Sequence, residues 1–201
     1  MENWESEVEQ NLEPSQPEPA GKPRKDTSGG RELYLNVRVL VTMMAAFVMV
    51  FTFAARIIVV SGPSMENTLW GGDLILVWGL GYTPEQGDIV VLTQENYQED
   101  SIVKRVIALE GQTVDINYDT NTVYVDGEPL KEDYTKEKMQ IPSYGEGLNH
   151  VTVPQGCIYV MGDNRNHSAD SRFPDIGIVD TRCVIGKGVA VMFPFHRWKG
   201  L

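Results

Sequence analysis

Three short stretches of the sequence carry side chains that could form a hydrolytic site. The first, "SGPSM" at 61–65, contains a Gly-Pro pair that favours a turn, and this turn would present the hydroxyl and backbone N–H of Ser64. A serine becomes an effective nucleophile only when a neighbouring base takes its proton. Most serines after Gly-Pro are ordinary turn or cap residues. Ser64 is therefore a candidate nucleophile that needs a partner.

The second stretch, "SIVKRVIAL" at 101–109, places Lys104 and Arg105 inside an apolar, strand-like run. Neighbouring residues of a strand point to opposite faces, but alternation alone does not say which of the two is directed inward. An arginine keeps its proton at any usable pH, whereas burial disfavours the ammonium form of a lysine and makes it a competent base. Lys104 is the candidate general base. The alternative is a solvent-facing charge on an edge strand.

The third stretch, "MGDNRNHSADSRFPDIG" at 161–177, concentrates charged and polar residues in a loop that follows the apolar run "CIYV". A calcium loop has the wrong spacing, because its third, sixth and twelfth positions would be Arg165, Ser168 and Pro174. No metal is therefore expected here. A polar surface loop held by its own ion pairs remains the alternative for this segment.

The elements that must position these residues read as strands. "GDLILV" at 72–77 and "GDIVVL" at 87–92 each join a Gly-Asp turn to an apolar run, and further short runs follow with turn residues between them. Amphipathic helical periodicity of useful length is missing from this part of the sequence. Residues 61–201 are therefore expected to form an antiparallel, mainly β domain.

An apolar segment precedes this domain. Residues 39–55 read "VLVTMMAAFVMVFTFAA" between Arg38 and Arg56, and a helix of that length spans about 25 Å against a hydrocarbon core of about 30 Å. Arg56 could snorkel and let the apolar residues after it extend the span, so we expect a transmembrane anchor at 33–60. A buried core helix and a cleavable signal peptide are the alternatives; the first usually has a polar stripe, and the second a shorter apolar region.

Composition and charge limit the remaining possibilities. Residues 1–32 are rich in Pro, Glu, Ser and Gly, which predicts a disordered tail. Basic residues gather before the apolar segment, so we expect a cytoplasmic N-terminus and an extracytoplasmic domain at the cell membrane. The formal net charge of −11 makes nucleic acid an unlikely partner. Cys157 and Cys183 lack zinc-binding spacing, and a disulfide between them stays open.

In this order, "SGPSM", "VKRVI" and "GDNRNHSADSR" resemble the diagnostic segments of the bacterial type I signal peptidases, the serine–lysine dyad leader peptidase family. Its members are membrane-bound serine endopeptidases that cut signal sequences from exported proteins. The resemblance runs from about residue 33 to the C-terminus. The expected fold class is thus mainly β, with antiparallel sheets in a partly open, barrel-like catalytic domain preceded by one N-terminal transmembrane helix.

The resemblance also implies roles for individual residues. The nucleophile of the family falls on Ser64 and its general base on Lys104. Ser168 matches the serine whose hydroxyl helps to orient that lysine. Asp170 and Arg172 match residues that brace the site.

Near the nucleophile, the sequence both follows the family and departs from it. Met65 matches the methionine beside the nucleophile. Gly62 stands where some relatives have a serine that supplies a hydroxyl to the oxyanion hole, which leaves the second donor open. The family often has Pro at the position of Asn67 and Gly at the position of Ala108.

The implied activity is removal of signal peptides from secreted preproteins, at the membrane lipid surface and without metal or organic cofactor. His167 is a rival base for Ser64, as in an ordinary Ser-His pair. Two other functions stay open: a catalytically inactive, membrane-anchored β binding module, and a specialised Ser-Lys peptidase with few clients.

Overall fold

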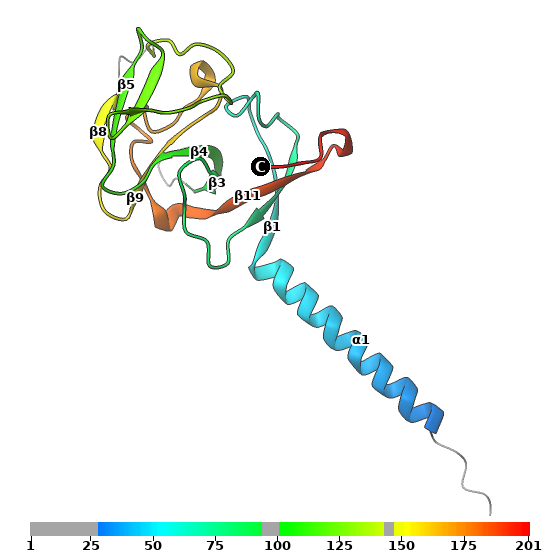
Figure 1. Ribbon diagram of the computed structural model, residues 1–201. Coiled ribbons are helices and arrows are strands. Elements are labelled where there is room, and N and C mark those ends of the chain that lie inside the picture. Colours follow the sequence, from blue (N-terminus) through cyan, green and yellow to red (C-terminus); the bar gives the residue numbers. More distant parts are fainter. Residues whose placement is uncertain (1–27, 94–100, 143–146) are drawn as a thin grey trace, which may run out of the picture. The chain divides into compact units, whose positions relative to one another are not determined.

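The computed structural model describes residues 28–93, 101–142 and 147–201 (Figure 1). The chain divides into two compact units, Met1–Met44 and Ala45–Leu201. The helices are α1 (Ser28–Phe53) and the short 3-10 helices η2 (Arg165–His167), η3 (Thr181–Cys183) and η4 (Phe195–Arg197). The strands are β1 (Ala55–Val59), β2 (Leu74–Trp78), β3 (Ile89–Leu92), β4 (Ile102–Ala108), β5 (Thr113–Asn117), β6 (Thr122–Val125), β7 (Glu128–Pro129), β8 (His150–Thr152), β9 (Cys157–Met161), β10 (Val179–Asp180), β11 (Val184–Phe193) and β12 (Lys199–Gly200).

Helix α1 contains the apolar segment and is longer at its N-terminal end than the sequence predicted. Its 26 residues correspond to about 39 Å at about 1.5 Å per residue, and it is long and apolar enough to cross a membrane. Residues 28–32, which we expected in the disordered tail, belong to this helix. The rest of the predicted tail, residues 1–27, lies outside the described residues.

The predicted C-terminal end of the anchor, residue 60, is wrong. The helix ends at Phe53, and β1 follows and pairs antiparallel with β2, with Ile57 opposite Leu76. Residues 57–60 are as apolar as the helix, so hydropathy could not mark the boundary. They are also all β-branched, which suits a strand, and the hydrogen bonds to β2 fix that state.

The described residues from 55 onward fold into two antiparallel sheets. The larger sheet has the order β1-β2-β11-β3-β4-β9-β10, with β12 also paired to β11, and the smaller sheet has the order β7-β6-β5-β8. The larger sheet forms a half-barrel. The prediction of a mainly β, antiparallel, partly open barrel-like domain after one N-terminal apolar helix is therefore confirmed.

Both faces of the central strands are buried, which explains their nearly continuous apolar sequences. Along β3, Val91 packs in one hydrophobic cluster, whereas Val90 and Leu92 pack in another. A third cluster joins the smaller sheet to β4 and β9. In β4 only Arg105 is not fully buried, so Lys104 lies in the interior of this sheet.

Candidate active site

The candidate nucleophile lies in the turn between β1 and β2. Gly62 has φ +73°, a left-handed conformation that glycine adopts without strain. Helix-like hydrogen bonds follow, including one of 2.7 Å from the Leu69 N–H to the Met65 carbonyl. Met65 is 1% exposed and packs in the core. The turn thus presents a half-buried Ser64 from a backbone that the core holds at Met65.

The candidate base contacts this hydroxyl from β4. Lys104 is 3% exposed, and its Nζ lies 3.0 Å from Ser64 Oγ and 3.0 Å from the Val103 carbonyl oxygen. Alternation along β4 puts Lys104 on the same face as Ile102 and Val106, which belong to one hydrophobic cluster. The structure therefore brings together the two residues that the sequence marked as nucleophile and base.

The turn between β1 and β2, residues 60–73, is here called the nucleophile turn, and the loop between β9 and β10, residues 162–178, the bracing loop. The bracing loop holds the nucleophile turn in place. The Asn164 N–H donates to the Ser64 carbonyl oxygen at 3.0 Å, and its side-chain Nδ2 donates to the Pro63 carbonyl oxygen at 3.0 Å. At Gly162, a Cβ atom would lie 2.5 Å from the Ser64 carbonyl oxygen and 2.3 Å from Ser168 Oγ. Only glycine allows this close approach.

Sequence reasoning did not single out Gly162 or Asn164 as site residues. Both lie in the motif that carried the family resemblance, so the signal was present. A glycine in a polar motif indicates a close backbone approach, but the sequence does not say which segment approaches it.

Asp170 and Arg172 form a buried pair within this loop. Arg172 donates to both carboxylate oxygens, at 2.8 and 2.9 Å, and both side chains are essentially inaccessible. The Gly162 N–H also donates to Asp170, at 3.0 Å. Burial alone would raise the pKa of Asp170, but the charge and hydrogen bonds of Arg172, together with the Gly162 N–H and Ser168, outweigh it and lower that pKa. The pair thus fixes the loop from inside.

Ser168 lies next to this pair. Its Oγ is buried and helps to lower the pKa of Asp170, although it has no hydrogen-bond partner of ordinary geometry among the described residues. Its role in orienting Lys104 stays a prediction.

A second ion pair, which the sequence did not reveal, joins three segments of the site. Arg105 donates to Asp163 at 2.8 and 2.7 Å, and the Thr68 hydroxyl donates to the same carboxylate. Burial lowers the pKa of Arg105, but the pair with Asp163, together with nearby Tyr134 and Glu132, outweighs it and raises that pKa. The nucleophile turn, β4 and the loop after β9 are therefore tied at one carboxylate.

His167, the rival base, lies elsewhere. Its side chain is 64% exposed, and its Nδ1 is 3.7 Å from a Glu137 carboxylate oxygen. Cys157 and Cys183 are free thiols. Within the described ranges, no group of three or more His, Cys, Asp and Glu side chains could hold a metal ion.

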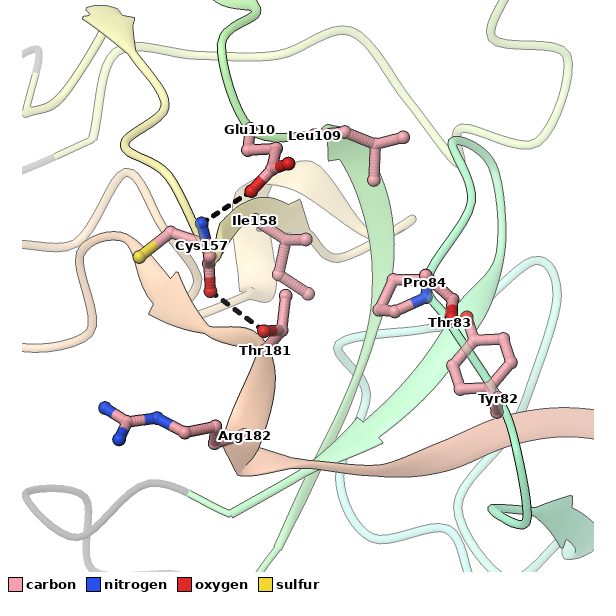
Figure 2. A pocket seen from close by; sticks show the side chains of 10 residues that line it. Tyr82, Thr83, Pro84, Leu109, Glu110, Cys157, Ile158, Thr181 and Arg182 are labelled. Atoms are coloured by element: carbon pink, nitrogen blue, oxygen red, sulfur yellow. Dashed lines mark hydrogen bonds between the residues drawn. The ribbon is translucent and has the colours of Figure 1, made fainter.

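The structure also has a cavity of about 400 Å³, and neither Ser64 nor Lys104 lines it. Figure 2 shows its lining residues, among them Tyr82, Glu110 and Thr181. The Glu110 carboxylate and the Thr181 hydroxyl both bond to the backbone of Gly156. These polar groups therefore serve the local fold, and the candidate active site remains the Ser64–Lys104 pair.

Fold and site together define a class of protein. The structure is a mainly β half-barrel after an apolar helix, and it places a serine hydroxyl against a buried lysine, a pair of residue types that some hydrolases use as nucleophile and base.

Comparison with known proteins gives the family. The chain matches the model of "Signal peptidase, peptidase S26" over residues 33–193. It is 36% identical to a probable signal peptidase I-1 of Synechocystis, with 81% of this chain and 84% of that protein covered. The identity is 33% to a probable signal peptidase I of Mycobacterium leprae, with 80% and 76% covered. It is 32% to a signal peptidase I of Bacillus licheniformis, with 86% and 95% covered.

Among solved structures, a crystal structure of a signal peptidase I from Enterococcus faecalis V583 matches at 30% identity and a TM-score of 0.43, covering 53% of this chain and 97% of that one. From the family match and the relatives, the chain belongs to the signal peptidase family, peptidase S26. The resemblance predicted from the three stretches is confirmed.

Proposed function

We propose that this protein is a membrane-anchored serine endopeptidase that removes N-terminal signal peptides from exported preproteins, with Ser64 as nucleophile and Lys104 as general base. The observation that carries the proposal is the 3.0 Å contact between Ser64 Oγ and Lys104 Nζ. This distance lies within the reach required for proton transfer between a nucleophile and its base. The curated relatives that are named signal peptidases supply the substrate class.

The reaction follows from this contact. Neutral Lys104 accepts the proton of the Ser64 hydroxyl while Oγ attacks the scissile carbonyl carbon. The Lys104 ammonium then returns the proton to the amine that leaves as the scissile C–N bond breaks, and an ester to Ser64 remains. Lys104 next takes a proton from water, whose oxygen attacks the ester, and Ser64 regains a proton as the peptide carboxylate departs.

Burial supports the role of Lys104 as base. The side chain is 3% exposed, and taking an ammonium group out of water disfavours its charged form. Turnover is therefore expected to increase with pH as the amine loses its proton, and to be lost in acid. A rate that is already flat from pH 5 upward would contradict a lysine base.

Stabilisation of the developing oxyanion is assigned first to the Ser64 backbone N–H. Gly62 has no side chain, so this chain lacks the hydroxyl that some relatives place there. One oxyanion donor contributes about 10²–10³ in rate. The backbone of the nucleophile turn therefore has to be held firmly.

Two features support membrane anchoring. Helix α1 is long and apolar enough to span a bilayer. The β domain also exposes large apolar side chains: Phe195 is 78% and Trp198 72% accessible, and Ile57 and Leu80 are each 63% accessible. Exposed apolar groups of this kind are typical of surfaces that contact a membrane or a partner. The excess of Lys and Arg before the apolar segment at 39–55 supports a cytoplasmic N-terminus and an extracytoplasmic catalytic domain.

The test uses the full chain in detergent with a secretory precursor peptide. Ser64→Ala and Lys104→Ala should each abolish cleavage, whereas His167→Ala, at an exposed side chain, should retain most of it. The reverse pattern would contradict the assignment. Wild-type protein that binds precursor without turnover would instead indicate a binding module, and turnover of only a few among many precursors would indicate a specialised peptidase.

A further inference from the structure

Residues 132–140 form an irregular segment with a turn at 133–134 and a bend at 136–137, here called the strap, that follows β7 of the smaller sheet. Its C-terminal end is held by that sheet: Met139 is 5% exposed in the cluster of the smaller sheet, and its N–H bonds to the Asn121 side chain. The rest of the strap crosses the segments that carry the candidate catalytic residues.

The strap first contacts the nucleophile turn. Asn67 Nδ2 donates to the Tyr134 carbonyl oxygen at 3.0 Å and lies 3.4 Å from the Thr135 carbonyl oxygen. Lys136 forms an ion pair of 2.6 Å with Glu66. Both turn residues follow Ser64 within three positions, so the strap is bonded to the backbone segment next to the nucleophile.

The strap also contacts the strand of the base and the bracing loop. The Arg105 guanidinium lies 4.0 Å from the centre of the Tyr134 ring. The Lys136 N–H donates to the Asp163 carbonyl oxygen at 3.1 Å. Glu132 pairs with Arg165, and these side chains are 11% and 2% exposed. One segment therefore touches all three parts of the site.

Asn67 is suited to this junction by its backbone as well as its side chain. Its φ of +92° is left-handed, a conformation in which Asn and Asp are enriched among residues with a Cβ. Proline, which is often found here in the family, has φ fixed near −65° and has no amide to donate. Asn67 therefore provides both the left-handed turn and the hydrogen bond to the strap, and proline at this position could provide neither.

We propose that the strap is a positioning element for the peptidase, and that Asn67 is the positioning residue through which it sets the placement of Ser64 against Lys104. This inference rests on the proposed function. Ser64 and Lys104 come from separate segments, and their contact holds only while the turn, β4 and the loop keep their register. A displacement of about 1 Å can cost about 10² in rate.

The test compares variants of the full chain in detergent with a precursor peptide. Asn67→Asp keeps the size and the tolerance for a left-handed backbone but replaces the donor by a carboxylate facing two carbonyl oxygens. We expect kcat to fall about 10- to 100-fold with KM within about twofold, because the interaction serves the transition state rather than binding. Asn67→Gly keeps the backbone conformation and should lose activity in the same way.

Lys136→Met should lower kcat less, because its ion pair is partly exposed. Combined with Asn67→Asp, it should give a loss smaller than the product of the single losses, since both act on the same junction. Lys131→Met is the matched control: it removes a neighbouring lysine whose partner is exposed Asp133, and it should retain wild-type kcat.

The outcomes separate the strap from the proposed function. Wild-type kcat in both Asn67 variants, or a change confined to KM, would overturn the positioning role of the strap. If Ser64→Ala is inactive in the same assay, the peptidase assignment still holds. Cleavage by Ser64→Ala would overturn the peptidase assignment itself. Thermal unfolding of each variant shows whether it is folded at the assay temperature. If Asn67→Gly is not folded, Asn67→Asp alone decides: wild-type kcat or a change confined to KM in that variant overturns the positioning role.

Discussion

Replacement of Gly162 by alanine tests how closely the bracing loop approaches the nucleophile. The added Cβ would lie 2.5 Å from the Ser64 carbonyl oxygen and 2.3 Å from Ser168 Oγ. Non-bonded contacts of this kind need about 3.5 Å. One of the two segments must therefore move by roughly 1 Å. The Ser64 backbone cannot yield alone, because its carbonyl oxygen accepts the Asn164 N–H.

The expected cost is larger in activity than in stability. A displacement of about 1 Å at a reacting group costs about 10² in rate, which corresponds to about 2.7 kcal/mol of transition-state stabilisation. Overpacking of a buried site typically costs about 1–3 kcal/mol of unfolding free energy. Gly162→Ala should therefore be folded but about 10²-fold lower in kcat/KM.

The assay is steady-state cleavage of a precursor peptide in detergent, with thermal unfolding of the same samples. Gly200→Ala is the matched control, because its Cβ would meet nothing closer than 4.0 Å. It should retain both activity and stability. Wild-type kcat/KM in Gly162→Ala would show that the added Cβ does not displace Ser64. A loss of activity that is fully explained by the unfolded fraction of the sample would show the same.

Two further predictions concern the buried ion pairs. Because the pKa of Asp170 is lowered in the folded state, the pair with Arg172 stabilises the protein above the ordinary aspartate range, and this contribution is lost as pH falls through the folded-state pKa. Asp170→Asn should lower the free energy of unfolding at neutral pH by about 3–5 kcal/mol and flatten its dependence on pH below about 4. The measurement is denaturant unfolding at a series of pH values; an equal change of unfolding free energy with pH in the two proteins would contradict this. Arg105→Lys cannot bond both Asp163 oxygens while lying against Tyr134, so we expect about tenfold lower kcat/KM and a lower Tm. Unchanged values for this variant would show that the bidentate geometry is dispensable.

The local properties of this protein could be predicted from its amino-acid sequence. Strand-forming runs, Gly-Asp turns and a long apolar segment follow from residue type and spacing, so the mainly β class and the apolar helix could be predicted. The chemical choice of Lys104 over Arg105 also came from residue type, since only a lysine can lose its proton. The order of the three motifs was enough to indicate the family.

Contacts between groups that are distant in the sequence could not be predicted and became known only from the folded structure. Lys104 lies 40 positions from Ser64, and Asn164 contacts Pro63 across 101 positions. Strand alternation says which face a side chain occupies but not which segment covers that face, so the partners of Asp163 and the approach at Gly162 were not predictable. The end of α1 was missed for the same reason. An apolar, β-branched run is equally compatible with a bilayer or a sheet, and only the hydrogen bonds of a neighbouring strand select between them.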